Sequence, residues 1–296
     1  MGAAAALGSS ALWALTSVLL ASQAGRMRPL LMSAIRSLTA SLILVGLLIA
    51  TSGLVQLREM TFITGISMAC SGIMGQALGD TLYITALGFL GVTRTFPITN
   101  SAYPFLTFLL AVLLLGEAVT WTLPIGGALI VAGITWIVLE QRRSAAEDAV
   151  QVELLRGVAF ALAAAACWAT ATIWLRGQQG DLNAIGAASL RIPAASAAVW
   201  MTIGLTSRSR ATQPLRPITP RSVALVALAG LLGTGLGSIL FIYAIETIGA
   251  AKTAFLTTSA PVFALPMGVL FLSEKITPRV LLGTVITIAG IWLVLL

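Results

Sequence analysis

Long apolar segments without charged residues constrain this chain more than any other feature of its sequence. Thr95–Gly116 and Ala118–Leu139 are both uncharged and 22 residues long, and a helix needs about 20 apolar residues to cross a bilayer. Charged residues make up 9% of the chain, whereas a soluble domain carries about 25%. Strands of a membrane β-barrel are only about 10 residues long. The sequence therefore predicts an all-α integral membrane protein.

Ten long apolar segments with at most one charged residue are present, five on each side of the polar stretch 140–156. Three of them contain one charged residue each, namely Arg36, Asp80 and Arg191. The predicted spans are Met1–Gly25, 29–57, Met60–Thr93, Thr95–Gly116, Ala118–Leu139, Gly157–Leu175, Leu182–Ser207, Ser222–Ile245, Thr253–Ser273 and Val280–Leu296.

The two halves of the chain are similar to each other when one is shifted by 155 to 158 residues. The matched residues are rare types at fixed spacing, which chance agreement in an apolar sequence does not produce. They pair Trp13 with Trp168, Arg36 with Arg191, Gly72, Gly75 and Gly79 with Gly230, Gly233 and Gly237, Pro104 with Pro261, and Glu117 with Glu274. We expect a first repeat over 1–140, a polar linker over 141–154 and a second repeat over 155–296.

Five helices per repeat is an odd number, so the second repeat must enter the membrane upside down relative to the first. Inverted repeats are a recurring construction of transporters, with the substrate site near the midplane where the repeats meet. The fold predicted from the sequence is thus ten transmembrane helices arranged as two inverted five-helix repeats.

The net charge of +7 has a distribution that indicates a membrane and not a nucleic acid. Of the seventeen Lys and Arg residues, twelve fall in the loops that follow the odd-numbered helices, three fall in the loops on the opposite face, and two lie inside helices. Cytoplasmic loops carry the excess of Lys and Arg. The count predicts a multi-pass protein of the cell membrane (inner or plasma) with both termini outside.

Several chemistries are disfavoured by residues that the sequence lacks. It contains no histidine, both cysteines (Cys70 and Cys167) fall inside predicted helices, and its ten acidic residues are scattered. The segment Gly249–Thr253 lacks the glycine that precedes the lysine of a phosphate-binding loop. We therefore expect no enzyme activity, no cofactor and no metal site.

The motifs of the two halves resemble those of the EamA domain. The glycine triplet is followed by Tyr83-Ile-Thr-Ala86 in the first half and by Phe241-Ile-Tyr-Ala244 in the second, then by a proline and a closing acidic residue (Gly116-Glu117 and Ser273-Glu274). This resemblance covers essentially the whole chain as two EamA domains. It implies the drug/metabolite transporter superfamily, whose ten-helix members are often exporters of amino acids or other metabolites.

The resemblance implies a secondary transporter that exports small amphipathic metabolites, with amino acids as candidates, by alternating access. Its expected partners are a small-molecule substrate and the lipid bilayer, and its expected driving force is proton coupling or exchange. Two alternatives stay open: a multidrug or cationic-compound exporter in which Asp80 is the counter-charge, and a non-transporting membrane scaffold.

Candidate site residues are polar and aromatic side chains away from the predicted interfaces. Asp80 lies near the centre of a 34-residue span, where an ionised Asp costs roughly 2.5–3.5 kcal/mol. It is therefore predicted to carry protons or substrate charge, or to pair with Arg36, Arg191 or a helix terminus. The candidate substrate-binding residues are Trp13, Asp80, Tyr83, Asn100, Tyr103, Trp168, Phe241 and Thr258.

Three further features have predicted structural roles. Pro104 and Pro261 lie inside helices, where proline removes a backbone hydrogen bond and produces a kink. The glycine triplets are predicted to allow close helix packing, because small residues let backbones approach each other in lipid. Glu117 and Glu274 are expected beside the N-terminus of the helix that follows each of them, where the helix dipole favours a carboxylate.

Overall fold

A computed structural model describes residues 1–23, 26–51, 53–90, 92–118, 120–141, 151–205, 217–260, 262–263 and 278–296, and the regular structure in these ranges is helical. The helices of the first half are α1 (Gly2–Ala21), α2 (Pro29–Ala50), the short α3 (Leu54–Glu59), α4 (Phe62–Gly72), α5 (Asp80–Leu90), α6 (Val92–Leu115) and α7 (Thr122–Gln141). Those of the second half are α8 (Gln151–Gln178), α9 (Ala184–Leu205), α10 (Pro220–Ala229), α11 (Ser238–Ile248), α12 (Ala250–Thr257) and α14 (Pro278–Leu295).

Two π-helical segments connect helices that the sequence predicted as single spans. The segment η1 (Ile73–Gly79) joins α4 to α5, and η4 (Gly230–Gly237) joins α10 to α11. The segment η4 contains Gly230, Gly233 and Gly237, whereas η1 contains Gly75 and Gly79 and begins directly after Gly72, the last residue of α4. π-helical turns are rare and are frequently found at functional sites.

The predicted membrane-spanning architecture is confirmed. Within the described ranges six helices are long and apolar enough to cross a bilayer, and three shorter apolar helices accompany them over Gly2–Thr16, Thr122–Gly133 and Leu281–Leu295. Large apolar side chains such as Leu42, Leu113 and Trp292 are exposed on the outside of the bundle, as expected of a surface that faces lipid. The predicted span Thr253–Ser273 is described only by α12 and a few residues after it.

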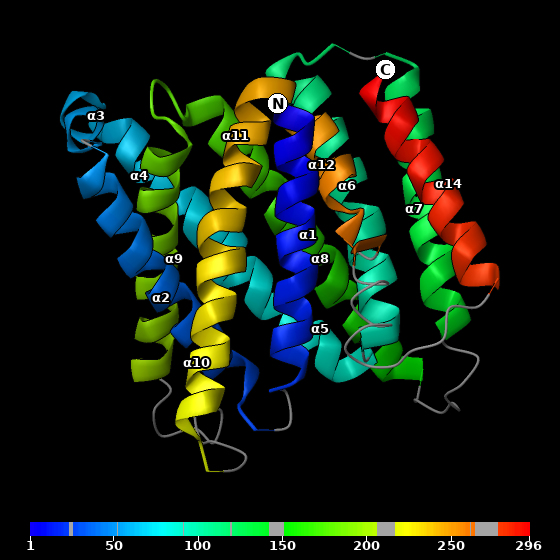
Figure 1. The fold of residues 1–296 in the computed structure, drawn as a ribbon, viewed down its shortest axis with the longest axis horizontal. Coiled ribbons are helices and arrows are strands. Elements are labelled where there is room, and N and C mark those ends of the chain that lie inside the picture. Colours follow the sequence, from blue (N-terminus) through cyan, green and yellow to red (C-terminus); the bar gives the residue numbers. More distant parts are fainter. Residues whose placement is uncertain are drawn as a thin grey trace.

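The second repeat is inverted relative to the first. The start of α1 lies against the end of α11, because a Cβ at Gly2 would overlap the side chain of Thr247. The end of α8 lies at the same place, because Gln179 donates a hydrogen bond to Glu246. Since α1 and α8 are the equivalent first helices of the two repeats, they run in opposite directions. Both chain termini accordingly lie at the same end of the bundle (Figure 1).

The glycine triplets make equivalent contacts in the two halves. A Cβ at Gly72 would overlap the backbone of Arg191, and a Cβ at Gly230 would overlap the backbone of Arg36. Each π-helical segment is thus packed directly against the second helix of the opposite repeat. The close-packing role predicted for the glycines fits this arrangement.

A second pair of equivalent contacts relates α7 to α14, which lie side by side at one edge of the bundle (Figure 1). A Cβ at Gly126 would lie 2.8 Å from the Gly290 carbonyl oxygen, and a Cβ at Gly133 would lie 2.6 Å from that of Gly283. The sequence alignment pairs Gly126 with Gly283 and Gly133 with Gly290. One contact therefore becomes the other when the repeats are exchanged, which is the signature of a pseudo-two-fold axis.

Candidate functional site

Asp80 is the acidic centre of the candidate site. It begins α5 directly after η1, and one carboxylate oxygen, Oδ2, accepts a hydrogen bond from Arg36 Nη2 at 2.9 Å in an ion pair. The other oxygen, Oδ1, accepts from Trp168 Nε1 at 3.1 Å. The Asp80 and Arg36 side chains are 22% and 24% exposed. The carboxylate is therefore contacted by residues of both repeats. Of the partners predicted for it, namely Arg36, Arg191 or a helix terminus, the structure shows Arg36.

Aromatic side chains surround this carboxylate. The Tyr83 ring lies 5.3 Å from the Trp168 ring in a tilted arrangement, and the Tyr103 ring lies 6.3 Å from it edge-on. The Tyr103 hydroxyl is 3.3 Å from Thr172 Oγ1. We call Arg36, Asp80, Tyr83, Tyr103, Trp168 and Thr172 the Asp80 cluster. It combines one ion pair, three hydroxyls and three aromatic rings, which suits an amphipathic ligand.

The position equivalent to Asp80 in the other half carries no carboxylate. Trp13 donates from Nε1 to the Gly233 carbonyl at 3.1 Å and lies 5.4 Å from the Phe241 ring. Ser238, which aligns with Asp80, is buried. The two halves therefore differ in charge where their geometry is equivalent.

The other candidate residues lie on α6, on or beside α12, or outside the described residues. Thr258 directly follows α12 as its C-cap, and its hydroxyl donates to the Phe255 carbonyl at 2.7 Å. Asn100 is half-buried on α6, and Pro104 is buried one residue after Tyr103 on the same helix, which continues past it to Leu115. Pro261 lies outside the described residues.

Glu117 has a different partner from the one expected. Its oxygens Oε1 and Oε2 accept from the backbone N–H groups of Ala250 at 2.7 Å and Ala251 at 3.1 Å. These are the first residues of α12, which belongs to the opposite repeat. Gly249, at φ 84°, forms the tight turn that presents this helix start. The expectation that Glu117 serves α7, the helix that follows it, is therefore wrong, and its equivalent Glu274 lies outside the described residues.

Sequence reasoning omitted three members of this neighbourhood from the candidate site: Arg36, Thr172 and Arg191. Arg191 is 6% exposed, and its buried Nε atom has no hydrogen-bond partner. A Cβ at Gly75 would lie 3.9 Å from Arg191 Nη2, which places the guanidinium beside η1. Both arginines were recognised in the sequence by their charge inside an apolar span and were named as partners of Asp80, but they were not included among the substrate-binding residues.

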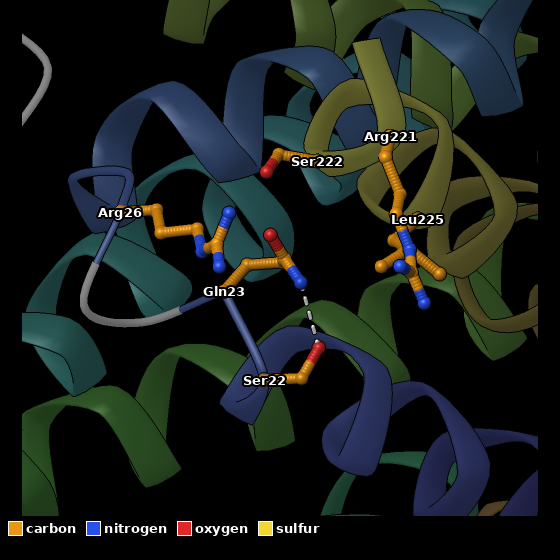
Figure 2. Close-up of a pocket in the computed structure, with 6 residues that line it drawn as sticks. All are labelled: Ser22, Gln23, Arg26, Arg221, Ser222 and Leu225. Atoms are coloured by element: carbon orange, nitrogen blue, oxygen red, sulfur yellow. Dashed lines mark hydrogen bonds between the residues drawn. The ribbon is translucent and has the colours of Figure 1, made fainter. Parts of the chain in front are cut away.

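A separate polar pocket of about 290 Å³ opens where α1 ends and α10 begins. Gln23 donates to Ser22 Oγ at 2.8 Å, and Arg26 and Arg221 flank it (Figure 2). Both arginines belong to the loops with the excess of positive charge. This pocket therefore lies on the face that the sequence predicts to be cytoplasmic, at the end of the bundle opposite to the chain termini (Figure 1).

No constellation typical of a metalloenzyme occurs among the residues that the structure describes, since no three His, Cys, Asp or Glu side chains are grouped closely enough to hold a metal ion. The residues of the Asp80 cluster instead bring one ion pair and three aromatic rings together inside a bundle of membrane-spanning helices. The class of protein that this fold defines is a multi-pass membrane transporter built from inverted repeats.

The comparison with known families agrees with this class. The model of the EamA-like transporter family matches the chain twice, over residues 1–139 and 155–296, so the chain belongs to that family. Its members are multi-pass membrane transporters and not enzymes. None of the curated proteins matches.

A solved crystal structure of a protein has the same fold. It is 17% identical in sequence, and the superposition has a TM-score of 0.80 and covers 99% of this chain and 95% of that one. At this identity the likeness shows the arrangement of the helices and no more.

Proposed function

We propose that this protein is a secondary transporter that exports small amphipathic metabolites, with amino acids among the candidates, by alternating access of its two repeats. The observation that carries the proposal is the Asp80 cluster, in which α2, α5 and α6 of the first repeat meet α8 of the second. A substrate bound there would contact both repeats. Relative motion of the repeats would then change the side from which the site is reached.

The Glu117 contact supports a mechanism in which one face closes while the other opens. Glu117 ties the end of α6 to the start of α12, so it joins the two repeats at one face of the bundle. In an inverted repeat the equivalent contact of Glu274 would join them at the opposite face. Alternate formation of the two contacts would give the two states of the transport cycle.

The contacts of Asp80 favour a metabolite exporter over a cationic-compound exporter. A cationic substrate would need a carboxylate without a partner, whereas Asp80 is already paired with Arg36. We further propose coupling by protons or by exchange. In proton coupling, protonation of Asp80 would weaken its ion pair with Arg36. In exchange, binding of a counter-substrate would take the place of that protonation.

Reconstitution of the purified protein in liposomes tests this proposal. A panel of labelled amino acids and related amphipathic metabolites is loaded, and flux is followed with and without a pH gradient and with and without internal counter-substrate. Transport of at least one compound above protein-free liposomes is the expected result. Absence of flux for the whole panel in monodisperse, folded protein would contradict it.

A matched pair of variants localises the site. Trp168→Phe removes the indole N–H that donates a hydrogen bond to Asp80. Trp13→Phe removes the equivalent indole N–H, which donates to the Gly233 carbonyl. If the substrate site is the Asp80 cluster, Trp168→Phe changes the apparent KM of the transported compound and Trp13→Phe does not. The same change in both variants would argue for a packing role of the two tryptophans.

A further inference from the structure

Arg191 carries a buried positive charge for which the described part of the chain supplies no counterion. The side chain is 6% exposed and its Nε atom lacks a hydrogen-bond partner. The ion pair found among the described residues joins Arg36 to Asp80 instead. Charged side chains inside membrane-spanning helices are rare, face the interior of the bundle, and pair with one another or mark the path of a substrate.

The position of Arg191 relates it to the Asp80 cluster. Its guanidinium lies beside η1, because a Cβ at Gly75 would lie 3.9 Å from Arg191 Nη2 and 2.9 Å from the Cβ of Ala171 on α8. Ala171 precedes Thr172, whose hydroxyl is 3.3 Å from that of Tyr103, and Tyr103 packs edge-on against Trp168. The unpaired cation therefore lies where η1 meets α8, close to the residues of α8 that belong to the Asp80 cluster.

Comparison of the repeats shows why Arg191 is unpaired. Arg191 aligns with Arg36, and Ser238 aligns with Asp80. In the first half the Asp80 carboxylate neutralises its arginine, whereas in the second half a buried serine hydroxyl stands at the equivalent position. Two arginines and one aspartate leave a charge of +1 inside the membrane (2 − 1 = +1).

We propose that Arg191 binds an oxyanion of the transported substrate, with the carboxylate of an amphipathic organic acid or amino acid as the expected group. The planar guanidinium presents paired N–H donors that match a carboxylate in a bidentate geometry. The hydroxyls of Tyr103 and Thr172 in the Asp80 cluster would supply further donors, and the Trp168 ring would offer an apolar face to the rest of the molecule. This inference deepens the proposed transport function and rests on it for the identification of the ligand as substrate.

Binding to the full-length protein in detergent tests the inference separately from transport. The probes are phenylacetate and L-phenylalanine, the corresponding amides phenylacetamide and L-phenylalaninamide, and inorganic phosphate. The readout is the rise in the thermal unfolding midpoint with ligand concentration, because a ligand that binds only the folded state stabilises it. The carboxylates are expected to stabilise the parent protein and the amides are not. Phosphate stabilisation without carboxylate stabilisation would identify a free inorganic anion as the ligand and overturn the proposed carboxylate.

Four variants separate binding by Arg191 from a structural role. Arg191→Gln is expected to weaken carboxylate binding about tenfold to a hundredfold, the range for losing a hydrogen bond to a charged group. Arg191→Lys keeps the positive charge but lacks the paired N–H donors of the guanidinium. Its affinity for carboxylates should therefore lie between those of the parent and of Arg191→Gln. Ser238→Asp would place a carboxylate where Asp80 stands in the other half and should abolish the ligand effect while the protein stays folded. Arg58→Gln, a change at an exposed arginine on α3, should match the parent.

The outcomes distinguish this inference from the proposed function. If no carboxylate stabilises the parent, or if Arg191→Gln and Ser238→Asp both bind carboxylates as the parent does, the anion site is overturned. Liposome flux of neutral or cationic compounds would in that case leave the transport proposal intact. Carboxylate binding without flux of any panel compound would instead support the site and contradict the transport proposal.

Discussion

The Asp80 carboxylate joins the two repeats through Trp168, whose indole Nε1 donates to Oδ1 at 3.1 Å while Arg36 occupies Oδ2 at 2.9 Å. Arg36 and Asp80 belong to the first repeat and Trp168 to the second. Displacement of α8 relative to α5 would therefore break the hydrogen bond to Trp168 and leave the ion pair with Arg36 intact. A charged residue in the middle of the membrane thus takes part in the contact that an alternating-access motion would have to change.

Asp80→Asn tests the proposed proton coupling. The substitution keeps the size of the side chain and an acceptor for Trp168, but it removes the group that can take up a proton. We expect the variant to insert and fold, to lose flux driven by a pH gradient, and to retain counter-flow exchange. The measurement is flux per folded molecule in liposomes at matched protein density.

A structural role of Asp80 gives the opposite pattern. Folded protein would then be lost, because Arg36 is left without its counterion, while flux per folded molecule would stay near that of the parent. Equal pH-driven flux per molecule in Asp80→Asn and parent would refute the coupling.

Glu117→Gln tests the contact between the end of α6 and the start of α12. The neutral amide keeps one acceptor and loses the charge that favours a helix N-terminus. We expect a loss of about 1–2 kcal/mol in the free energy of unfolding, the upper range for removal of a helix cap. Glu59→Gln, at an exposed glutamate on α3, is the control and should stay within about 0.5 kcal/mol. Equal stability of the two variants would argue that the Glu117 contact contributes nothing.

Gly72→Ala tests the packing of the end of α4, directly before η1, on α9. An added Cβ would overlap the Arg191 backbone, and backbone atoms cannot move aside as a flexible side chain can, so we expect a loss of about 1–3 kcal/mol or more. Gly46→Ala on α2 is the control, because nothing lies within 4 Å of its added Cβ, and it should be neutral or stabilising. Thermal unfolding in detergent measures both, and an unchanged midpoint in Gly72→Ala would show that the helices separate without cost.

Ser144→Cys tests the orientation in the membrane. Residue 144 lies outside the described residues, beside Arg142 and Arg143, and the twelve-to-three distribution of Lys and Arg predicts that it faces the cytoplasm. The expected result is no labelling by an impermeant thiol reagent in intact cells and efficient labelling after permeabilisation. The parent chain, whose Cys70 and Cys167 lie in helices, gives the background. Efficient labelling in intact cells would reverse the orientation.

Most of the fold could be predicted from the sequence, because the signals for it can be read along the chain without knowledge of how the helices pack. Apolar spans follow from the absence of charge, and the inverted repeat follows from rare residues such as Trp13 and Trp168 recurring at a fixed distance. The π-helical form of η1 and η4 could not be predicted in this way. It concerns which carbonyl each backbone N–H contacts, and the spacing of apolar residues and glycines along the sequence does not specify that.

The candidate site was predicted in part. Asp80, Tyr83, Tyr103 and Trp168 lie together, and the cost of a buried carboxylate was reason enough to expect Asp80 to have a partner. The sequence could not show that Asp80 pairs with Arg36 and not with Arg191, because both arginines lie at equivalent depth in equivalent helices. Glu117 was misassigned because a sequence shows the next helix along the chain, whereas the helix start that it caps is more than 130 residues away.

The π-helical segments also alter the phase of the helices that contain them. A π turn holds about one residue more than an α turn, and each residue of an α-helix advances the side-chain direction by roughly 100°. The side chains of α5 are therefore rotated by an angle of that order from where an unbroken helix starting at Phe62 would direct them. A helical wheel drawn over the whole span would turn Asp80 away from Trp168 and Arg36. Pairs for cross-linking or spectroscopic labels across η1 or η4 should be chosen from contacts on one side of the π segment only.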